Sequence, residues 1–181
     1  MNSFAELAKE RRSIRQFTDE KLKAEEVELI IKSALLAPTS RNCRAWKFIL
    51  VEDKEMLQQL ALSKKNYGVF LKHCALAIVV LNNPVQSAAP VEDASIAAAY
   101  IQLQAEDLGL GSCWCHITGR ETADGHDSEQ YVRDLLDIPF QYGVTCIIGI
   151  GRKERIIKSH EEDHLLWENV YIERFTENEQ P

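Results

Sequence analysis

Residues 37–51 read APTSRNCRAWKFILV, a polar turn that leads directly into an apolar segment. Pro38 fixes its own φ and disfavours the α conformation at Ala37, so the amphipathic helix predicted for residues 25–36 must end there. Residues 46–51 are rich in β-branched and aromatic side chains, which predicts a buried strand. A helix therefore ends and a core strand begins within this one stretch.

The turn itself is a candidate ligand-binding loop. Thr39, Ser40 and Asn42 present two hydroxyls and an amide between two rigid elements. An ordinary helix-to-strand connection uses the same turn-forming residues, so both interpretations stay open.

The rest of the chain alternates helical and strand patterns. A Ser3 and Glu6 capping box predicts a first helix to about residue 11. Hydrophobic periodicity predicts further helices after an Asp53 cap and at residues 92–108 and 128–136, and apolar runs predict strands at residues 74–81, after Gly109 and at residues 143–150. The small residues of segment 92–108 favour close packing on another helix, either within one core or on its own copy across a dimer axis.

The composition describes one compact domain. The chain has 181 residues, 45% of them hydrophobic and 27% charged, and a net charge of −7, which argues against general binding to nucleic acid or anionic membranes. It contains no apolar run of the roughly 20 residues needed for a membrane span and no signal-peptide core near residue 1, so we expect a cytoplasmic protein. The five cysteines are odd in number and lie in apolar surroundings, which favours free thiols, and their spacing indicates no metal site.

A cluster of cations lies at residues 11–15. Arg11, Arg12 and Arg15 flank the Ser13 hydroxyl, and the planar guanidinium groups suit a phosphate. Cations at the end of a helix, stabilised by the helix dipole, would give the same pattern.

Two further polar residues have open interpretations. Asn66 is placed either to bond a heterocycle edge or simply to form the turn beside Gly68. His116 is either an acid or a packed surface histidine. We predict a single domain over residues 1–181, in which residues 154–181 form an extension. Its apolar side chains pack on the domain or on a partner subunit.

Four segments, taken together, resemble the FMN-dependent nitroreductase family. They are RRSIR at 11–15, APTSRN at 37–42, LGLGSCW at 108–114 and IGIG at 148–151, and the resemblance covers nearly the whole chain. It implies an α+β, three-layer nitroreductase-like fold, with a central mixed sheet flanked by helices, and an intertwined homodimer that binds one FMN tightly at each subunit interface.

The same resemblance assigns residues to the flavin. Arg11, Arg12 and Ser13 would meet the phosphate and ribityl chain, and Arg15 would face the pyrimidine edge. The further residues assigned to the flavin are Pro38, Thr39, Ser40 and Asn42 from the other subunit, Trp114 and Cys115 along one face or edge of the ring, Lys158 at the phosphate, and Asn66 at the pyrimidine edge.

The implied activity needs no protein acid or base. NADH or NADPH delivers hydride to the flavin and leaves, and a nitro compound, quinone or related conjugated acceptor takes its place, which is a ping-pong mechanism. The chain departs from the family pattern at Arg44-Ala45 and at Cys115-His116. The competing hypotheses are a flavin carrier or redox-sensing protein without nicotinamide turnover, and a dimeric interaction protein without a cofactor. The sequence names neither the acceptor nor the preferred nicotinamide.

Overall fold

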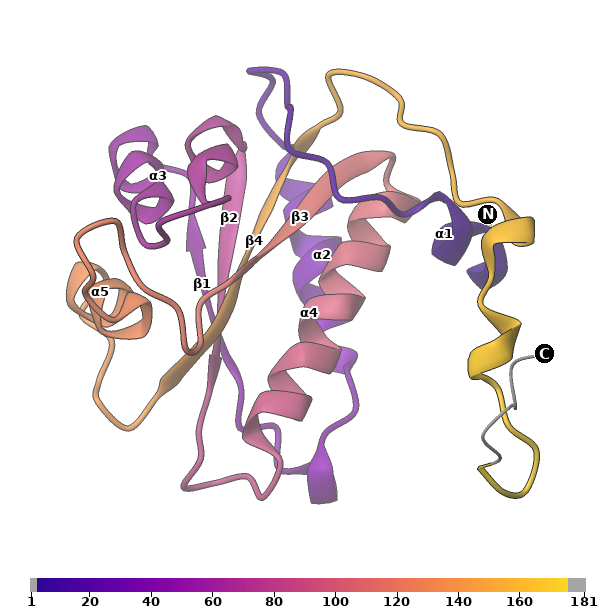
Figure 1. Ribbon diagram of the computed structural model, residues 1–181. Helices are drawn as coiled ribbons and strands as arrows, with labels where there is room; N and C mark the ends of the chain where they lie inside the picture. Colours follow the sequence, from indigo (N-terminus) through magenta and orange to yellow (C-terminus); the bar gives the residue numbers. More distant parts are fainter. Residues whose placement is uncertain (1–2, 176–181) are drawn as a thin grey trace.

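The computed structural model describes residues 3–175, and its centre is a four-stranded sheet in the order β1-β2-β4-β3. All three ladders are antiparallel. The strands are β1 (Lys47–Val51), β2 (Leu76–Asn82), β3 (Leu110–His116) and β4 (Gly143–Arg152) (Figure 1). The expected mixed sheet differs from this arrangement, because within residues 3–175 the parallel pairing is limited to an isolated bridge between Ser13 and Ser112.

The two central strands behave as their sequences predict. Every residue of β2 is buried, and its side chains alternate between the two faces of the sheet. By contrast, the strand predicted to be buried after the polar turn is an edge strand, and Val51 alone among its five residues is buried. Its apolar side chains nevertheless pack on both faces of the sheet, Phe48 against one core and Ile49 and Val51 against the other. Trp46, which precedes the strand, is buried.

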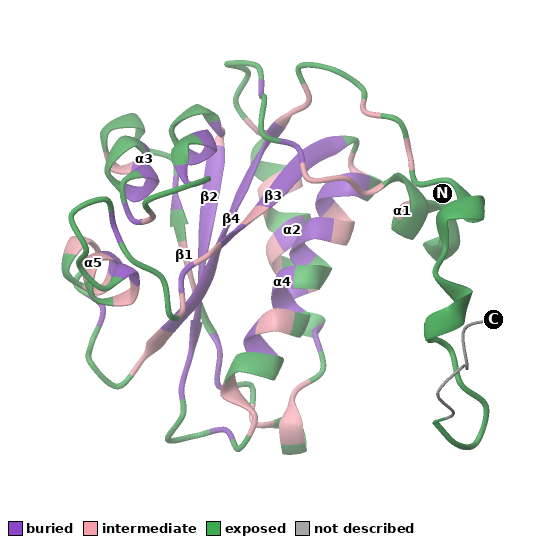
Figure 2. Cartoon of the chain, in the orientation of Figure 1, coloured by how far each residue is buried: buried purple, intermediate pink, exposed green. Residues whose placement is uncertain are grey.

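Helices cover both faces of the sheet, so the three-layer α+β architecture is confirmed. One core lies between the sheet and the helices α2 (Ala24–Leu36) and α4 (Pro90–Asp107). The other lies under α3 (Lys54–Ala61), α5 (Ser128–Leu135) and the short helix η2 (Val69–His73). Figure 2 shows the buried residues concentrated on the strands and on the sides of the helices that face them.

The helix ends follow from the predicted caps. Helix α1 (Phe4–Glu10) has the Ser3 and Glu6 capping box, and the Asp53 carboxylate caps α3 through the Met56 N–H at 2.9 Å. Helix α4 begins at Pro90, two residues before the predicted start, because proline is favoured in the first turn. Short 3₁₀ turns complete the described elements: η1 (Ser40–Asn42), η3 (Glu162–His164) and η4 (Trp167–Asn169).

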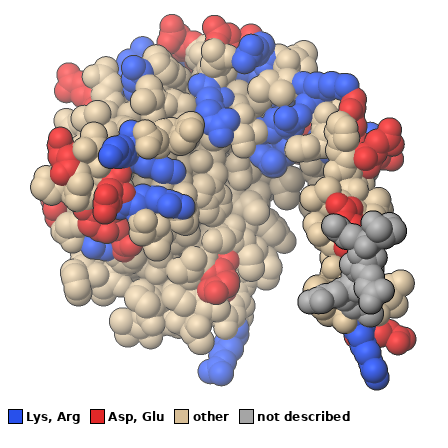
Figure 3. All heavy atoms as spheres, viewed as in Figure 1, with Lys and Arg blue, Asp and Glu red and all other residues tan. Residues whose placement is uncertain are grey.

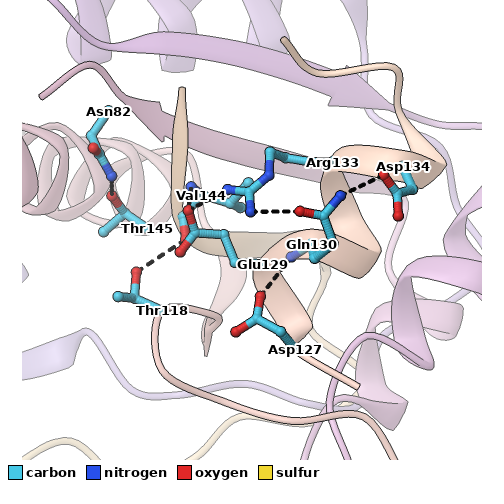
Figure 4. A network of polar contacts seen from close by, with 9 residues as sticks. All are labelled: Asn82, Thr118, Asp127, Glu129, Gln130, Arg133, Asp134, Val144 and Thr145. Carbon is cyan, nitrogen blue, oxygen red and sulfur yellow. Dashed lines mark hydrogen bonds and ion pairs between the residues drawn. The ribbon is translucent and has the colours of Figure 1, made fainter. Parts of the chain in front are cut away.

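A polar network fixes α5 to the start of β4 (Figure 4). The Glu129 carboxylate accepts hydrogen bonds from Arg133 Nη1 at 2.6 Å and from the Val144 N–H at 3.2 Å. On the neighbouring strand, Asn82 Nδ2 donates to Thr145 Oγ1 at 2.9 Å. These residues lie at the opposite end of β4 from residues 11–15, here called the arginine segment. They therefore serve to hold the fold together.

Residues 154–175, here called the arm, leave the sheet, pass α1 and continue down the side of the molecule (Figure 1). The arm touches the body through the His160 N–H, which donates to the Lys9 carbonyl at 3.0 Å, and through a 3.0 Å ion pair between Lys9 and Glu162. Its apolar side chains stay exposed, with Trp167 and Phe175 each 71% accessible. The predicted extension also includes residues 176–181, which lie outside the described residues. No helix within residues 3–175 is both long enough and apolar enough to span a bilayer.

Candidate functional site

The arginine segment is fixed along the free edge of β3. The Ile14 N–H donates to the Ser112 carbonyl at 2.9 Å, and the Thr18 N–H donates to the Arg152 carbonyl at 3.0 Å. Gly111 permits this close approach, because a Cβ at that position would lie 2.7 Å from Ile14. Ile14 therefore occupies the space in which a side chain at position 111 would lie.

Three cations surround β3 at Cys113. Burial raises the pKa of the Cys113 thiol, while the charges of Arg15, Arg11 and Lys64 act in the opposite direction. Within residues 3–175 none of these three cations forms an ion pair with an acidic side chain. Unpaired positive charges converging on one strand form a site for an anionic group.

The sequence interpretation missed Lys64. It singled out Asn66 in the same turn, and the structure places Asn66 on the surface, two residues from Lys64. The Lys65 N–H anchors this turn by donating to the Glu121 carbonyl at 2.8 Å. The signal available in the sequence was the pair Lys64-Lys65, but nothing in it indicated that one of the two lies beside β3.

Arg12 and Lys158 are brought together at the start of the arm. Arg12 Nη1 donates to the Lys158 carbonyl, and the Lys158 ammonium pairs with Glu161. The side chain of Lys158 is 78% accessible. The Lys158 backbone therefore contacts the arginine segment, while the charge of its side chain is shared with Glu161.

Trp114 and Cys115 point to opposite faces of the sheet. Trp114 is half-buried on the α4 side, where its ring lies near that of His116, with centroids 6.4 Å apart and planes at 22°. The Cys115 side chain is fully buried in the core beneath α3 and α5. The Cys115 thiol is therefore closed off from a ligand at this edge.

The ionisable side chains of β3 are held neutral. Burial raises the pKa of Cys115 to about 11, against the opposing charge of Lys64. Burial lowers the pKa of His116, and the charges of Arg120 and Lys64 lower it further. At neutral pH this strand therefore offers neither a thiolate nucleophile nor an imidazolium.

The second group of predicted residues, Pro38, Thr39, Ser40 and Asn42, lies near the N-terminus of α4, because the Ser40 N–H donates to the Asp93 carboxylate at 2.7 Å. Ser112, which pairs with the arginine segment, follows the C-terminal end of the same helix (Figure 1). With a rise of about 1.5 Å per residue, α4 separates the two groups by roughly 20 Å. One chain does not bring them into a single compact cluster.

Two side-chain oxygens of the loop at residues 38–42 already accept hydrogen bonds from Arg44, so the groups left for a ligand are mainly donors. Thr39 Oγ1 accepts from the Arg44 N–H at 3.1 Å, and Asn42 Oδ1 accepts from Arg44 Nε at 2.9 Å. The Thr39 hydroxyl hydrogen, the Ser40 hydroxyl and the Asn42 amide nitrogen remain for a ligand. Arg41, Asn42 and Arg44 all have positive φ, a conformation that costs each about 1 kcal/mol, so contacts with the rest of the chain must hold the loop.

Charged side chains are unevenly distributed over the surface. Figure 3 shows Lys and Arg side chains over the upper part of the molecule, while the lower part of the same face carries few charges. Within residues 3–175 no group of three or more His, Cys, Asp or Glu side chains is arranged to hold a metal ion. The structure thus offers organic anions a cationic edge on β3.

A thiol reagent applied to the folded protein should label Cys43 and leave the other four cysteines unmodified. Cys43 is half-exposed, whereas the others are buried, and burial raises the pKa of Cys74 to about 12. Mass spectrometry of peptides from labelled native and denatured protein measures this difference. Labelling of Cys113 or Cys115 in the native protein would contradict the placement of their thiols in the core.

A sheet between two helical layers defines an α+β protein, and the cations near one edge of the sheet suit an anionic ligand. The model of the nitroreductase family matches residues 8–67 and 55–152. The solved structure of an FMN-dependent nitroreductase from Clostridium difficile R20291 is 42% identical with a TM-score of 0.91, and the match covers 93% of this chain and 98% of that one. The chain belongs to the nitroreductase family, which confirms the resemblance found in its sequence.

Two further relatives support this assignment. A protein of Archaeoglobus fulgidus whose name includes NAD(P)H nitroreductase is 37% identical over 145 residues, which are 78% of this chain and 80% of the relative. The FMN reductase (NADPH) of Bacillus subtilis is 34% identical over 134 residues, which are 63% of this chain and 54% of that protein.

Proposed function

We propose that this protein is an FMN-dependent oxidoreductase that takes hydride from NADH or NADPH and reduces a nitro compound, a quinone or a related conjugated acceptor. The observation that carries the proposal is the set of three cations, Arg11, Arg15 and Lys64, that lie near Cys113 on β3 and form no ion pair within residues 3–175. The names of the relatives from Clostridium difficile and Bacillus subtilis support FMN and a nicotinamide as the redox partners.

The residues at this edge fit FMN. Arg11 and Arg12 offer guanidinium groups to a phosphate, and Ser13 adds a hydroxyl to the ribityl chain. Arg15 and Lys64 would supply positive charge to the flavin, and positive charge near its pyrimidine ring favours the negatively charged reduced form. When bound, the flavin accepts and then donates the hydride equivalent.

The ionisable side chains of β3 take no part in proton transfer at this site. The thiols of Cys113 and Cys115 have raised pKa values and stay protonated, and the lowered pKa of His116 keeps its imidazole neutral. No acid or base on β3 is therefore poised to exchange a proton with the substrate. The nicotinamide and the acceptor would bind at the same place in turn, which would make the mechanism ping-pong.

A homodimer completes this proposal. The loop at residues 38–42 lies roughly 20 Å along α4 from the arginine segment, so a second copy is needed to supply its donors to the same ligand. Leu36, 78% accessible, and the exposed apolar arm are surfaces that a second copy would cover. An apolar groove of about 500 Å³, lined in part by Phe4, Tyr100 and Leu103, lies between α1 and α4 and would receive part of that partner.

A visible spectrum tests the core of the proposal. Protein supplemented with FMN and desalted should remain yellow, and NADH or NADPH added without oxygen should bleach it. Retained colour that no nicotinamide bleaches would favour the flavin carrier or redox sensor instead. Loss of all colour on desalting would contradict a flavin protein.

The Arg15→Ala variant should bind FMN more weakly and have a flavin midpoint potential lower by about 30 mV, which corresponds to a tenfold loss of preference for the reduced form. The reason is that the variant removes one of the positive charges that stabilise the reduced ring. Potentiometric titration with a reference dye measures the shift. The Lys65→Ala variant, which removes an exposed charge from the turn of Lys64, should keep the parent's potential, and an equal shift in both variants would contradict a specific role for Arg15.

A further inference from the structure

Asp93 is a buried carboxylate that joins two loops to the first turn of α4. It is 3% accessible and accepts hydrogen bonds from the Ser40 N–H at 2.7 Å, from Ser87 Oγ at 2.6 Å and from Cys43 Sγ at 3.4 Å. Burial acts to raise its pKa, but these hydrogen bonds outweigh burial and hold the pKa below its ordinary value. The carboxylate is therefore charged, and all three of these hydrogen-bond donors lie outside α4.

The loop that Asp93 holds has hydrogen bonds of its own, including those from the Asn42 and Cys43 N–H groups to the Thr39 and Ser40 carbonyls at 3.0 Å each. Its backbone enters the left-handed region at Arg41, Asn42 and Arg44, with φ of 50°, 55° and 49°, where glycine is the usual residue. The hydrogen bond from the Arg44 N–H to Thr39 Oγ1 closes the loop on itself but does not attach it to the sheet or helices. Asp93 makes that attachment, through the Ser40 backbone and the Cys43 thiol.

We infer that Asp93 is a positioning residue, whose carboxylate keeps the loop at residues 38–42 in the shape that presents its hydroxyl and amide donors to FMN. The inference rests on the proposed function. It adds a residue that touches neither the flavin nor the acceptor and acts through Ser40 and Cys43. The loop is thereby ordered before the flavin arrives, so binding does not have to supply the free energy of ordering it.

Two substitutions of Asp93 distinguish loss of the hydrogen-bond acceptor from loss of the negative charge alone. In Asp93→Ala the Ser40 N–H, the Ser87 hydroxyl and the Cys43 thiol lose their acceptor, so FMN affinity should fall at least tenfold. In Asp93→Asn the amide oxygen still accepts from Ser40, so the loss should be smaller. Fluorescence titration of flavin gives both affinities, and the milder variant keeps the test informative where the alanine variant fails to fold.

A second readout needs no flavin. Trypsin cleaves after arginine, and the loop contains Arg41 and Arg44. In the apoprotein the Asp93→Ala loop should be cut at these two positions about tenfold faster than in the parent, because the loop has lost its attachment. The cuts are identified by mass spectrometry of the fragments.

The matched control is Glu26→Ala. Glu26 is another partly buried carboxylate with well-defined partners, accepting from Arg152 Nη1 and Nη2 at 2.9 Å each, and it lies outside the loop. Its loss should lower the melting temperature without changing loop cleavage or FMN affinity.

The outcomes separate the two proposals. If the parent binds FMN and Asp93→Ala binds it equally well, or if loop cleavage is unchanged, the positioning role is wrong. If the parent itself binds no FMN, the proposed function fails, and with it the role of Asp93 toward the flavin, whatever the cleavage pattern. An equal effect of Glu26→Ala on affinity would show that any loss of a buried carboxylate is sufficient, and would also overturn the inference.

Discussion

The Arg11→Ala/Arg12→Ala double variant should bind FMN about 100-fold more weakly than the parent and should bind riboflavin with nearly the parent's affinity. Each hydrogen bond to a charged group contributes at least about 1.5 kcal/mol, and losing two of them, about 3 kcal/mol, corresponds to about that factor. Riboflavin lacks the phosphate, so its affinity depends on the ring contacts that remain. Quenching of flavin fluorescence on titration with protein measures both affinities.

The Lys9→Ala variant is the control for this experiment. Lys9 lies on the same turn of chain as the arginines, but its charge is paired with Glu162 at 3.0 Å, so it should not contribute to the phosphate site. The preference of the parent for FMN over riboflavin should also weaken as salt is added, because the phosphate contacts are electrostatic. Parallel losses of FMN and riboflavin affinity in the double variant would show that Arg11 and Arg12 support the fold and do not bind the phosphate.

The elements that local sequence determines were predicted well. The caps at Ser3 and Asp53 start their helices where the pattern indicates, and Pro38 ends α2 at Leu36. The continuous apolar runs of β2 and β4 correctly indicated central strands, because a strand covered on both faces has no polar side to expose. Each of these features depends on residues that are neighbours in the chain.

The features that the sequence analysis predicted wrongly or missed depend on residues that are close in space but distant in the chain. The burial of β1 was overestimated because an apolar hexapeptide does not show whether it will have one hydrogen-bonded neighbour or two. The sequence-based assignment of Trp114 and Cys115 to one face or edge of the ring did not consider the alternation of the strand, which places the Cys115 thiol in the core opposite Trp114. Lys64 and Asp93 were missed because their roles depend on chain segments about 50 residues away, which a local pattern does not bring together.

Mixed dimers should recover flavin binding that neither variant has alone, if each site combines the arginine segment of one subunit with the loop of the other. The first variant is Arg11→Ala/Arg12→Ala, and the second is Thr39→Ala/Asn42→Ala, which removes two of the loop's free donors. In either homodimer both sites carry a defect. In a mixed dimer one site collects both defects and the other has an intact arginine segment and an intact loop, so about half of the sites are restored.

Co-expression of the two variants with different affinity tags, followed by two purification steps, isolates the mixed dimer. FMN bound per dimer is then measured at a flavin concentration that leaves both homodimers nearly empty. About one FMN per mixed dimer is expected, because one of its two composite sites is intact. No recovery would mean that each site is built within one chain. The separation of the two residue groups by roughly 20 Å along α4 makes that result unexpected, since only a second copy placed across the helix pair would bring an intact loop to an intact arginine segment.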